Sequence, residues 1–154
     1  MILSGQSIQN LNIMRPFIGR TRYKGMTFGC GSAGYDVRVE FQDTQKQIYL
    51  GPGDFILGST MDKFNMPLDV LGIVHDKSTW ARRGLAVQNT VIEPGWRGFL
   101  TLELTNHGPV GLTIEAGMPI AQIVFHWVDK PTTGYEGKYQ DQRRRPVEAI
   151  LEDN

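Results

Sequence analysis

One acidic residue in this sequence stands where it could transfer protons. Glu103 lies in the run 99–106, in which leucines and threonines alternate with the two-residue period of a β-strand. That period predicts that the leucines of the run face the core: Leu100, Leu102 and Leu104. Glu103 then shares the opposite face with Thr101 and Thr105. A carboxylate on such a face is most often a solvated surface group, so the strand alone does not make Glu103 catalytic.

A second segment, upstream of the first, has the residue types that hold phosphate. Ser78 or Thr79 could cap a short helical turn whose free N–H groups attract an anion, and Lys77 adds a positive charge at the entrance. Arg82 follows Ser78 by four residues, which places both on the same side of the turn, and Gly84 ends it. The alternative is an ordinary capped turn that carries surface cations.

The elements that must position these residues are predominantly β-strands. Short apolar segments alternate with Gly, Pro, Asn and Asp along the chain, which indicates an all-β sandwich or barrel. Strands are expected at 35–41, 47–50, 54–59, 70–75, 85–88, 99–106, 111–114 and 118–128. Helical turns are expected at 4–10 and 78–83, and a mobile C-terminal arm is expected from about residue 130.

The composition fits a small soluble enzyme. The 154 residues suffice for one domain with one core, and 16 basic residues balance 16 acidic ones, unlike in a general nucleic-acid-binding protein. The single cysteine, Cys30, excludes an internal disulfide and fits a reducing compartment. The sequence shows no signal peptide, and its longest apolar run, 120–128, is interrupted by Gln122 and His126. We therefore expect a cytoplasmic protein without a membrane partner.

Several segments carry motifs that occur together in one superfamily. They are Met1–Ser4 with Ile8, the Ser-Ala-Gly-Tyr-Asp-Val-Arg sequence at 32–38, and the segments 77–85, 91–106, 117–125 and 135–142. In this order, and over most of the chain, they resemble the trimeric deoxyuridine triphosphatase (dUTPase) and deoxycytidine triphosphate (dCTP) deaminase superfamily. The resemblance implies a homotrimer of distorted jelly-roll β-sandwiches with one or two short helices. Residues 1–129 would form the dUTPase-like β domain, and residues 130–154 a C-terminal arm that closes over the active site.

Two features favour the deaminase branch of this superfamily. A dUTPase has an aliphatic or polar residue in place of Glu103, and it ends in a glycine-rich arm that contains Gly-Phe-Gly. This chain has the acid instead, and its tail offers Tyr135, Lys138 and Gln142, which the deaminase branch uses around the nucleotide. The resemblance therefore implies hydrolytic deamination of a deoxycytidine nucleotide, dCTP to dUTP plus ammonia, in pyrimidine deoxynucleotide metabolism.

The reaction is expected to proceed without zinc. Zinc-dependent deaminases activate water on a metal held by His and Cys, with a Pro-Cys-x-x-Cys run. In this chain His75, His107 and His126 show no ligand spacing with each other or with Cys30. A carboxylate must then take the proton from water and deliver it to N3 and to the leaving ammonia, which requires a raised pKa. Glu103 is the candidate for this role.

The residues expected to assist Glu103 come from both segments and from the tail. Ser78 would orient water or phosphate, and Arg82 would fix the carboxylate and stabilise developing charge. The resemblance implies a magnesium ion bound through the substrate phosphates. The expected substrate-binding residues are Lys77, Ser78, Thr79, Arg82, Glu93, Thr101, Leu102, Glu103, Tyr135, Lys138 and Gln142. Trp96 could pack against the deoxyribose, although a core aromatic that caps the turn is the simpler interpretation.

Each site is expected to be shared between subunits. A small sandwich has little surface curvature for a deep pocket, and a cyclic interface supplies one. Glu103 would come from one chain and the segment 78–82 from its neighbour.

Three departures from the deaminase pattern keep alternatives open. Glu93 replaces the Asp that meets the sugar 3′-hydroxyl, the segment 86–90 is unlike the family's versions, and Arg-Arg-Arg-Pro follows Gln142 instead of Arg-Gly-Pro. The alternatives are a bifunctional dCTP deaminase and dUTP diphosphatase, a dUTPase that produces dUMP, a deaminase that also accepts dCMP, and a non-catalytic nucleotide-binding regulator.

Overall fold

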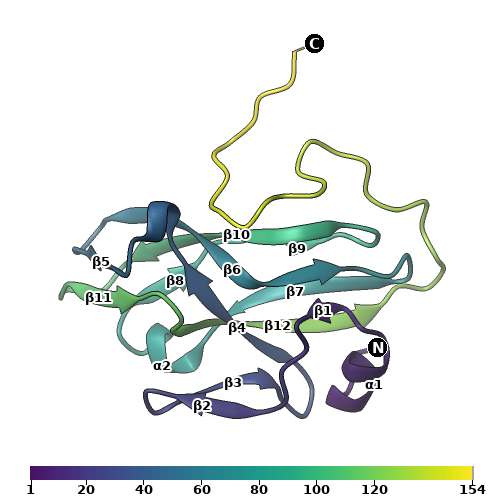
Figure 1. The fold of residues 1–154 in the computed structure, drawn as a ribbon, viewed down its shortest axis with the longest axis horizontal. Coiled ribbons are helices and arrows are strands. Elements are labelled where there is room, and N and C mark those ends of the chain that lie inside the picture. Colours follow the sequence, from purple (N-terminus) through teal and green to yellow (C-terminus); the bar gives the residue numbers. More distant parts are fainter. Residues whose placement is uncertain (154) are drawn as a thin grey trace.

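The computed structural model describes residues 1–153 and is built mainly of β-strands (Figure 1). The helical elements are α1 (Gly5–Asn10), the 3-10 turn η1 (Gln42–Thr44) and α2 (Ser78–Ala81). The strands are β1 (Met14–Arg15), β2 (Thr21–Tyr23), β3 (Met26–Cys30), β4 (Tyr35–Glu40), β5 (Gln47–Leu50), β6 (Phe55–Asn65), β7 (Val70–Asp76), β8 (Leu85–Val87), β9 (Val91–Ile92), β10 (Arg97–Asn106), β11 (Leu112–Glu115) and β12 (Pro119–Trp127). The expected all-β class is confirmed.

Most strands belong to one sheet that folds back on itself. Along its main path the strand order is β8-β10-β6-β4-β12-β7-β9, while β5 and β11 form a separate two-stranded sheet. β4 joins the two layers, because it pairs with β6 through Val39 and Glu40 and with β12 through residues 35–38. In Figure 1 β10 and β6 lie above β4 and β12. Strands from distant parts of the sequence are neighbours, as in a jelly-roll-like sandwich.

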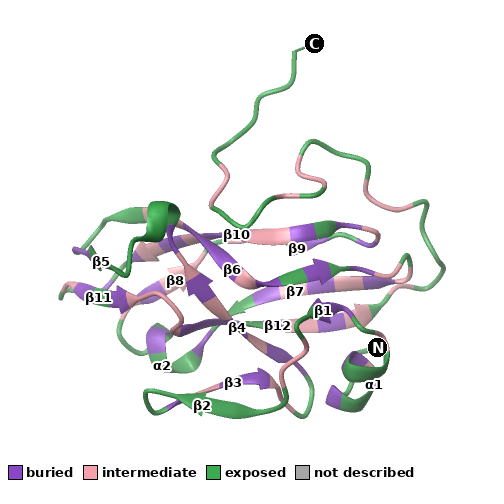
Figure 2. Cartoon of the chain, viewed as in Figure 1, coloured by how far each residue is buried: buried purple, intermediate pink, exposed green. Residues whose placement is uncertain are grey.

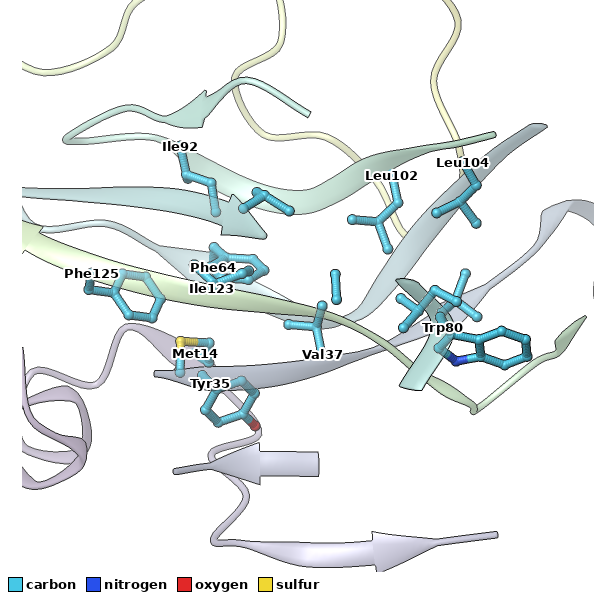
Figure 3. Close-up of a cluster of buried hydrophobic side chains, with 14 of the residues drawn as sticks. Met14, Tyr35, Val37, Phe64, Trp80, Ile92, Leu102, Leu104, Ile123 and Phe125 are labelled. Atoms are coloured by element: carbon cyan, nitrogen blue, oxygen red, sulfur yellow. The ribbon is translucent and has the colours of Figure 1, made fainter. Parts of the chain in front are cut away.

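The core fills the space between the two layers (Figure 3). Leu102 and Leu104 of β10 enter it from one layer, Val37 of β4 and Phe125 of β12 enter it from the other, and all four are fully buried. Burial of each such side chain contributes about 1.5–3 kcal/mol of transfer free energy. Figure 2 shows the contrasting exposure of β2 and of much of the C-terminal arm.

Each strand expected from the sequence is present, although several ends differ. The largest difference is in β6, which continues to Asn65 instead of ending at Ser59, because the polar residues Thr60 and Asp62 are buried within it. The strands β1, β2, β3 and β9 were missed. β1 and β9 have only two residues each, and all three residues of β2 are exposed, so these three strands carry no hydrophobic period.

The helices are short, as expected. α1 begins after Ser4, whose Oγ accepts the N–H of Ser7 at 3.3 Å. Throughout residues 1–153, no helix is both long enough and apolar enough to cross a membrane.

β10 departs from strict alternation near its start. Its pairing register with β6 shifts between Phe99 and Thr101, and the N–H of Leu100 donates to the Thr60 hydroxyl at 2.9 Å. Leu102 faces the core as predicted, whereas Leu100 is only half-buried and packs against the edge of the core. The irregularity brings Leu100 and Thr101 together into the wall of one cavity on the outer face of β10.

Candidate active site

A cavity of about 510 Å³ lies against the outer face of β10. Its walls are formed by side chains of β10, by residues 89–93, by Phe55 and Leu57 of β6, and by five residues of the C-terminal arm. Apolar and aromatic groups with a few polar ones are the usual lining of a site for a small organic molecule. Glu103 and Glu93 are the two carboxylates in this wall.

Glu103 is a partly desolvated carboxyl group in the cavity. The residue is half-buried, and burial raises the pKa of its carboxyl above the ordinary value. An ion pair would lower that pKa again, but the carboxylate takes part in none among residues 1–153. Such a group is suited to accept a proton and return it, as general acid–base catalysis requires.

The residues before Glu103 contribute differently to the cavity. Thr101 lies in the wall, and its hydroxyl donates to Gln142 Oε1 at 3.1 Å and accepts the N–H of Val147 at 3.0 Å. Leu102 has no exposed surface and points into the core, so only its main chain is available to a substrate. Glu93 is exposed in the turn that leads into β10.

The C-terminal arm lies across the start of β10 (Figure 1), and five of its residues line the cavity. The N–H of Tyr135 donates to the Pro94 carbonyl at 2.9 Å, and Trp96 Nε1 donates to the Tyr139 carbonyl at 2.7 Å. A salt bridge of 3.0 Å joins Arg97 to Asp141, and the N–H of Phe99 donates to the Gln142 carbonyl at 3.0 Å. The arm was expected to be mobile, but these contacts bind it to its own chain.

Of the three tail residues predicted to contact the nucleotide, two lie in the cavity wall and one lies outside it. Tyr135 and Gln142 are half-buried in the cavity wall. Lys138 is exposed outside that wall, and its ammonium lies 5.4 Å from the centre of the Tyr139 ring. Trp96 is buried, as expected of a core aromatic, and it also borders the cavity.

The segment 77–84, which was predicted to hold phosphate, differs from the sequence prediction in two respects. The N-cap of α2 is Lys77, without a side-chain capping bond, so the predicted cap by Ser78 or Thr79 is wrong. Lys77 is also not a free charge at an entrance, because it is buried and its Nζ lies 2.8 Å from Asp36 Oδ2. The ion pair compensates the desolvation of both groups. Gly84 ends the turn as expected, with φ of +94°.

Ser78 and Thr79 of α2 and Arg82 at its C-cap are exposed and do not line the Glu103 cavity. In Figure 1 α2 lies on the opposite side of the molecule from the C-terminal arm. Within residues 1–153 of one chain, Ser78 and Arg82 therefore lie apart from Glu103, with which they are expected to act across a subunit boundary.

Several residues that shape the cavity were not predicted, among them Asn89, Tyr139 and Val147. Asn89 lines it and bonds to the main chain of β10, and Tyr139 and Val147 line it from the arm. Tyr139 lies inside the recognised tail motif and could have been noticed there. Asn89 lies in the segment 86–90, which was noted only as unlike the family's versions, and Val147 carries no sequence signal, because its position depends on contacts made only in the folded chain.

The three histidines do not mark a metal centre in the part of the chain that the structure describes. No group of three His, Cys, Asp or Glu side chains lies close enough together there to hold a metal ion. The zinc-free mechanism expected from the sequence stays a prediction.

Comparison with known structures defines the fold further. A dCTP deaminase from Agrobacterium tumefaciens superposes with a TM-score of 0.64 at 16% identity, over 82% of this chain and 48% of that one. A mutant dUTPase from phage phi11 of S. aureus, described with a structural Mg(II) ion, gives a TM-score of 0.57 at 16% identity, over 80% and 97% of the two chains. At such identities these similarities show the fold alone, which is dUTPase-like.

Sequence comparison defines the family. A dCTP deaminase from Campylobacter fetus subsp. fetus is 35% identical over 95% of this chain and 94% of its own length. The family model described as dCTP deaminase-like matches residues 29–128, which include α2, Glu93 and Glu103. The chain therefore belongs to the dCTP deaminase-like family.

Proposed function

We propose that this chain catalyses the hydrolytic deamination of dCTP to dUTP and ammonia. The observation that carries the proposal is Glu103, a half-buried carboxyl with a raised pKa in the wall of a substrate-sized cavity. The chain also covers nearly the full length of a relative named dCTP deaminase. A pure dUTPase needs no such acid beside the base.

In the proposed mechanism Glu103 moves protons at two steps. Water adds to C4 of the cytosine ring while Glu103 accepts one water proton, and Glu103 then gives that proton to N3. The new C4 hydroxyl next loses its proton to Glu103, which passes it to the amino group. The C4–N bond breaks, ammonia leaves, and the C4 carbonyl of uracil forms with Glu103 ionised again.

The raised pKa supports this dual role. A carboxyl group with an ordinary pKa is a weak base and gives up its proton too readily to hold it for the second step. Burial brings the proton affinity of Glu103 closer to that needed at both steps. The half-buried position also limits competing water molecules.

Ser78 and Arg82 are proposed to act from a neighbouring subunit of a homotrimer. Both are exposed, Ser78 on α2 and Arg82 at its C-cap, outside the cavity that contains Glu103 in the same chain. An exposed serine and arginine four residues apart can meet the Glu103 cavity of another chain across a cyclic interface. Arg82 would then stabilise developing charge, and Ser78 would orient the attacking water or a phosphate.

The rest of the nucleotide is proposed to contact both chains. Thr101 and the main chain of Leu102 would lie beneath the base, and Glu93 would meet the sugar hydroxyl. Tyr135, Lys138 and Gln142 would close over the nucleotide from the arm. Lys77 and Thr79 would contribute to the phosphate site beside Ser78, Lys77 through the field of its ion pair and its main chain.

A magnesium ion is proposed to bind with the triphosphate. Residues 1–153 offer no cluster of three potential protein ligands, and Mg²⁺ commonly binds through substrate phosphates and water. The phage dUTPase with a similar fold is described with a Mg(II) ion. When bound, the ion would neutralise phosphate charge, and Glu103 would carry out the proton transfers without zinc.

Product analysis tests the function directly. The purified protein is incubated separately with dCMP, dCDP, dCTP and dUTP, and the products are identified by mass and by ammonia release. We expect dUTP and ammonia from dCTP, weaker use of dCTP after magnesium is removed, and no effect of a zinc-selective chelator. Diphosphate release without ammonia would instead assign the dUTPase alternative, and turnover that requires stoichiometric zinc would contradict the mechanism.

Removal of the arm before Tyr135 is expected to abolish turnover without unfolding the β domain. Tyr135, Tyr139 and Gln142 line the cavity, while the buried core side chains lie before residue 130. Circular dichroism and thermal unfolding would verify that the truncated protein is folded. A shorter truncation that removes only residues 151–154 is the matched control and should retain activity. Full activity of the longer truncation would show that the arm takes no part in catalysis.

A further inference from the structure

The hydrogen-bond ladder that supports Glu103 on the β8 side ends at this residue. β8 pairs with β10 only at Leu104, Thr105 and Asn106, and the last main-chain bond runs from the N–H of Gln88 to the Glu103 carbonyl at 2.9 Å. On the other side β6 continues, with Leu57 opposite Glu103. The N–H of Glu103 and the carbonyl of Thr101 point towards the side where β8 has ended, and both need partners there.

The side chain of Asn89 supplies these partners. Its Oδ1 accepts the N–H of Glu103 at 3.1 Å, and its Nδ2 donates to the Thr101 carbonyl at 2.7 Å. The two bonds fix the orientation of the amide, since an N–H requires an acceptor and a carbonyl requires a donor. A carboxamide offers the same donor and acceptor as a peptide group. Asn89 therefore replaces one rung of the missing strand beside the acid.

We propose that Asn89 is a positioning residue for Glu103. Its amide fixes the peptide groups on both sides of Leu102 and so sets the direction in which the Glu103 carboxyl enters the cavity. Asn89 is itself half-buried in the wall of that cavity. The inference deepens the proposed function and rests on the role of Glu103 as the proton-transfer group.

Accurate placement matters because the Glu103 side chain is long and flexible. A small rotation of its peptide plane is amplified at the carboxyl oxygens, and displacement of a reacting group by about 1 Å can lower a rate by about 10²-fold. No ion pair holds the carboxylate within the described residues, so the main chain is its chief source of order.

The first test compares Asn89→Ala with the neighbouring variant Gln88→Ala. Gln88 also joins this segment to β10, through its Oε1 and the Thr105 hydroxyl, but it is exposed and outside the cavity wall. We expect kcat of Asn89→Ala to fall by about 10²-fold with little change in KM. Gln88→Ala should remain close to the parent in both constants. Parent-like kcat in Asn89→Ala would overturn the proposal.

Asn89→Asp is the second variant and nearly preserves the shape of the side chain. It can still accept the N–H of Glu103, but it cannot donate to Thr101, and it places a negative charge beside the acid. The other titratable groups of the cavity wall are Glu93, Tyr135 and Tyr139. The added charge should raise the pKa of Glu103, so that the acid limb of the kcat profile moves to higher pH. If Asn89→Asp has the same maximal kcat and the same acid limb as the parent, the proposal is contradicted, even if Asn89→Ala does not fold.

Carbon-13 NMR titration of the Glu103 carboxyl separates this inference from the proposed function. If the parent deaminates no cytosine nucleotide, the proposed function fails, but the titration still reports on the contact. We expect a higher pKa in Asn89→Asp and a return towards the ordinary value in Asn89→Ala, where the loosened carboxyl is better hydrated. Identical titration in the parent and both variants would show that Asn89 does not position Glu103.

Discussion

Replacement of Glu103 by glutamine is expected to lower the rate of dCTP deamination by about 10²–10⁴-fold. The amide keeps the shape of the carboxyl and much of its hydrogen bonding, so nucleotide binding should be nearly unchanged. It cannot accept a proton from water, and the first step of the proposed mechanism is lost. Single-turnover kinetics and calorimetric binding measurements with dCTP would separate these two effects.

The matched control is Glu136→Gln, which changes an exposed carboxyl of the arm outside the cavity wall. This variant should keep the parent rate. Near-parent turnover in Glu103→Gln itself would mean that Glu103 is a surface acid, and the proton-transfer role would have to be assigned to another residue.

The same substitution has a pH signature with a defined sign. Burial raises the pKa of Glu103, and only the ionised form can accept the water proton. The parent rate should therefore fall as the pH drops through that pKa, and Glu103→Gln should lack this acid limb.

Stability should change in the opposite direction from activity. Because the pKa of Glu103 is raised in the folded state, its contribution to stability is fully present below the unfolded-state pKa and is lost as the pH rises through the folded-state pKa. Glu103→Gln removes the charged form, so its Tm at mildly alkaline pH should equal or exceed that of the parent. Loss of rate together with retained stability is typical of a residue kept for function.

The position of Glu103 could be predicted because it depends on a local pattern. Alternation along β10 separates the core residues Leu102 and Leu104 from the cavity residues Thr101 and Glu103, and the structure has this arrangement. The same pattern does not predict that Leu100 is only half-buried at the edge of the core. Its position is set by a shift in pairing with β6 and by a bond to Thr60, which is 40 residues away in sequence.

The surroundings of Lys77 could not be predicted in this way. Its residue type and its place before Ser78 indicated a free phosphate-binding charge, but in the folded chain it pairs with Asp36, which is 41 residues away. Composition does not reveal which acid neutralises a buried lysine. The pair forms because only β12 separates β4, which carries Asp36, from β7, which ends just before Lys77.

The contacts of the C-terminal arm also could not be predicted from the sequence. Its sequence is polar and rich in turn residues, which predicts mobility. Two of its contacts join residues 43 and 46 positions apart, Trp96 with Tyr139 and Thr101 with Val147. These two contacts use main-chain groups of the arm, which are the same for every residue type except proline, so the side-chain pattern gives no warning of them.

Mixed trimers of two inactive variants are expected to recover about a quarter of the parent activity. The variants are Glu103→Gln and Arg82→Ala, unfolded and refolded together in equal amounts. Suppose that each site takes Glu103 from one chain and Arg82 from the next. Random assembly then leaves Glu103 intact in about half of the sites and Arg82 intact in about half, so about one site in four has both residues intact. Arg82 is exposed outside the cavity of its own chain, which is why the partner must supply it.

The control variant for this experiment is Arg83→Ala. Arg83 is the adjacent exposed cation, and its guanidinium lies 5.0 Å from the centre of the Trp80 ring instead of beside a proposed substrate site. Its loss should leave activity close to that of the parent, which would show that the effect of Arg82→Ala is specific. Native mass spectrometry would establish that the two inactive chains had mixed. Mixed trimers without recovered activity would place Glu103 and Arg82 in the same chain's site and refute the shared site, because a site in which both residues come from one chain can never be intact in this mixture.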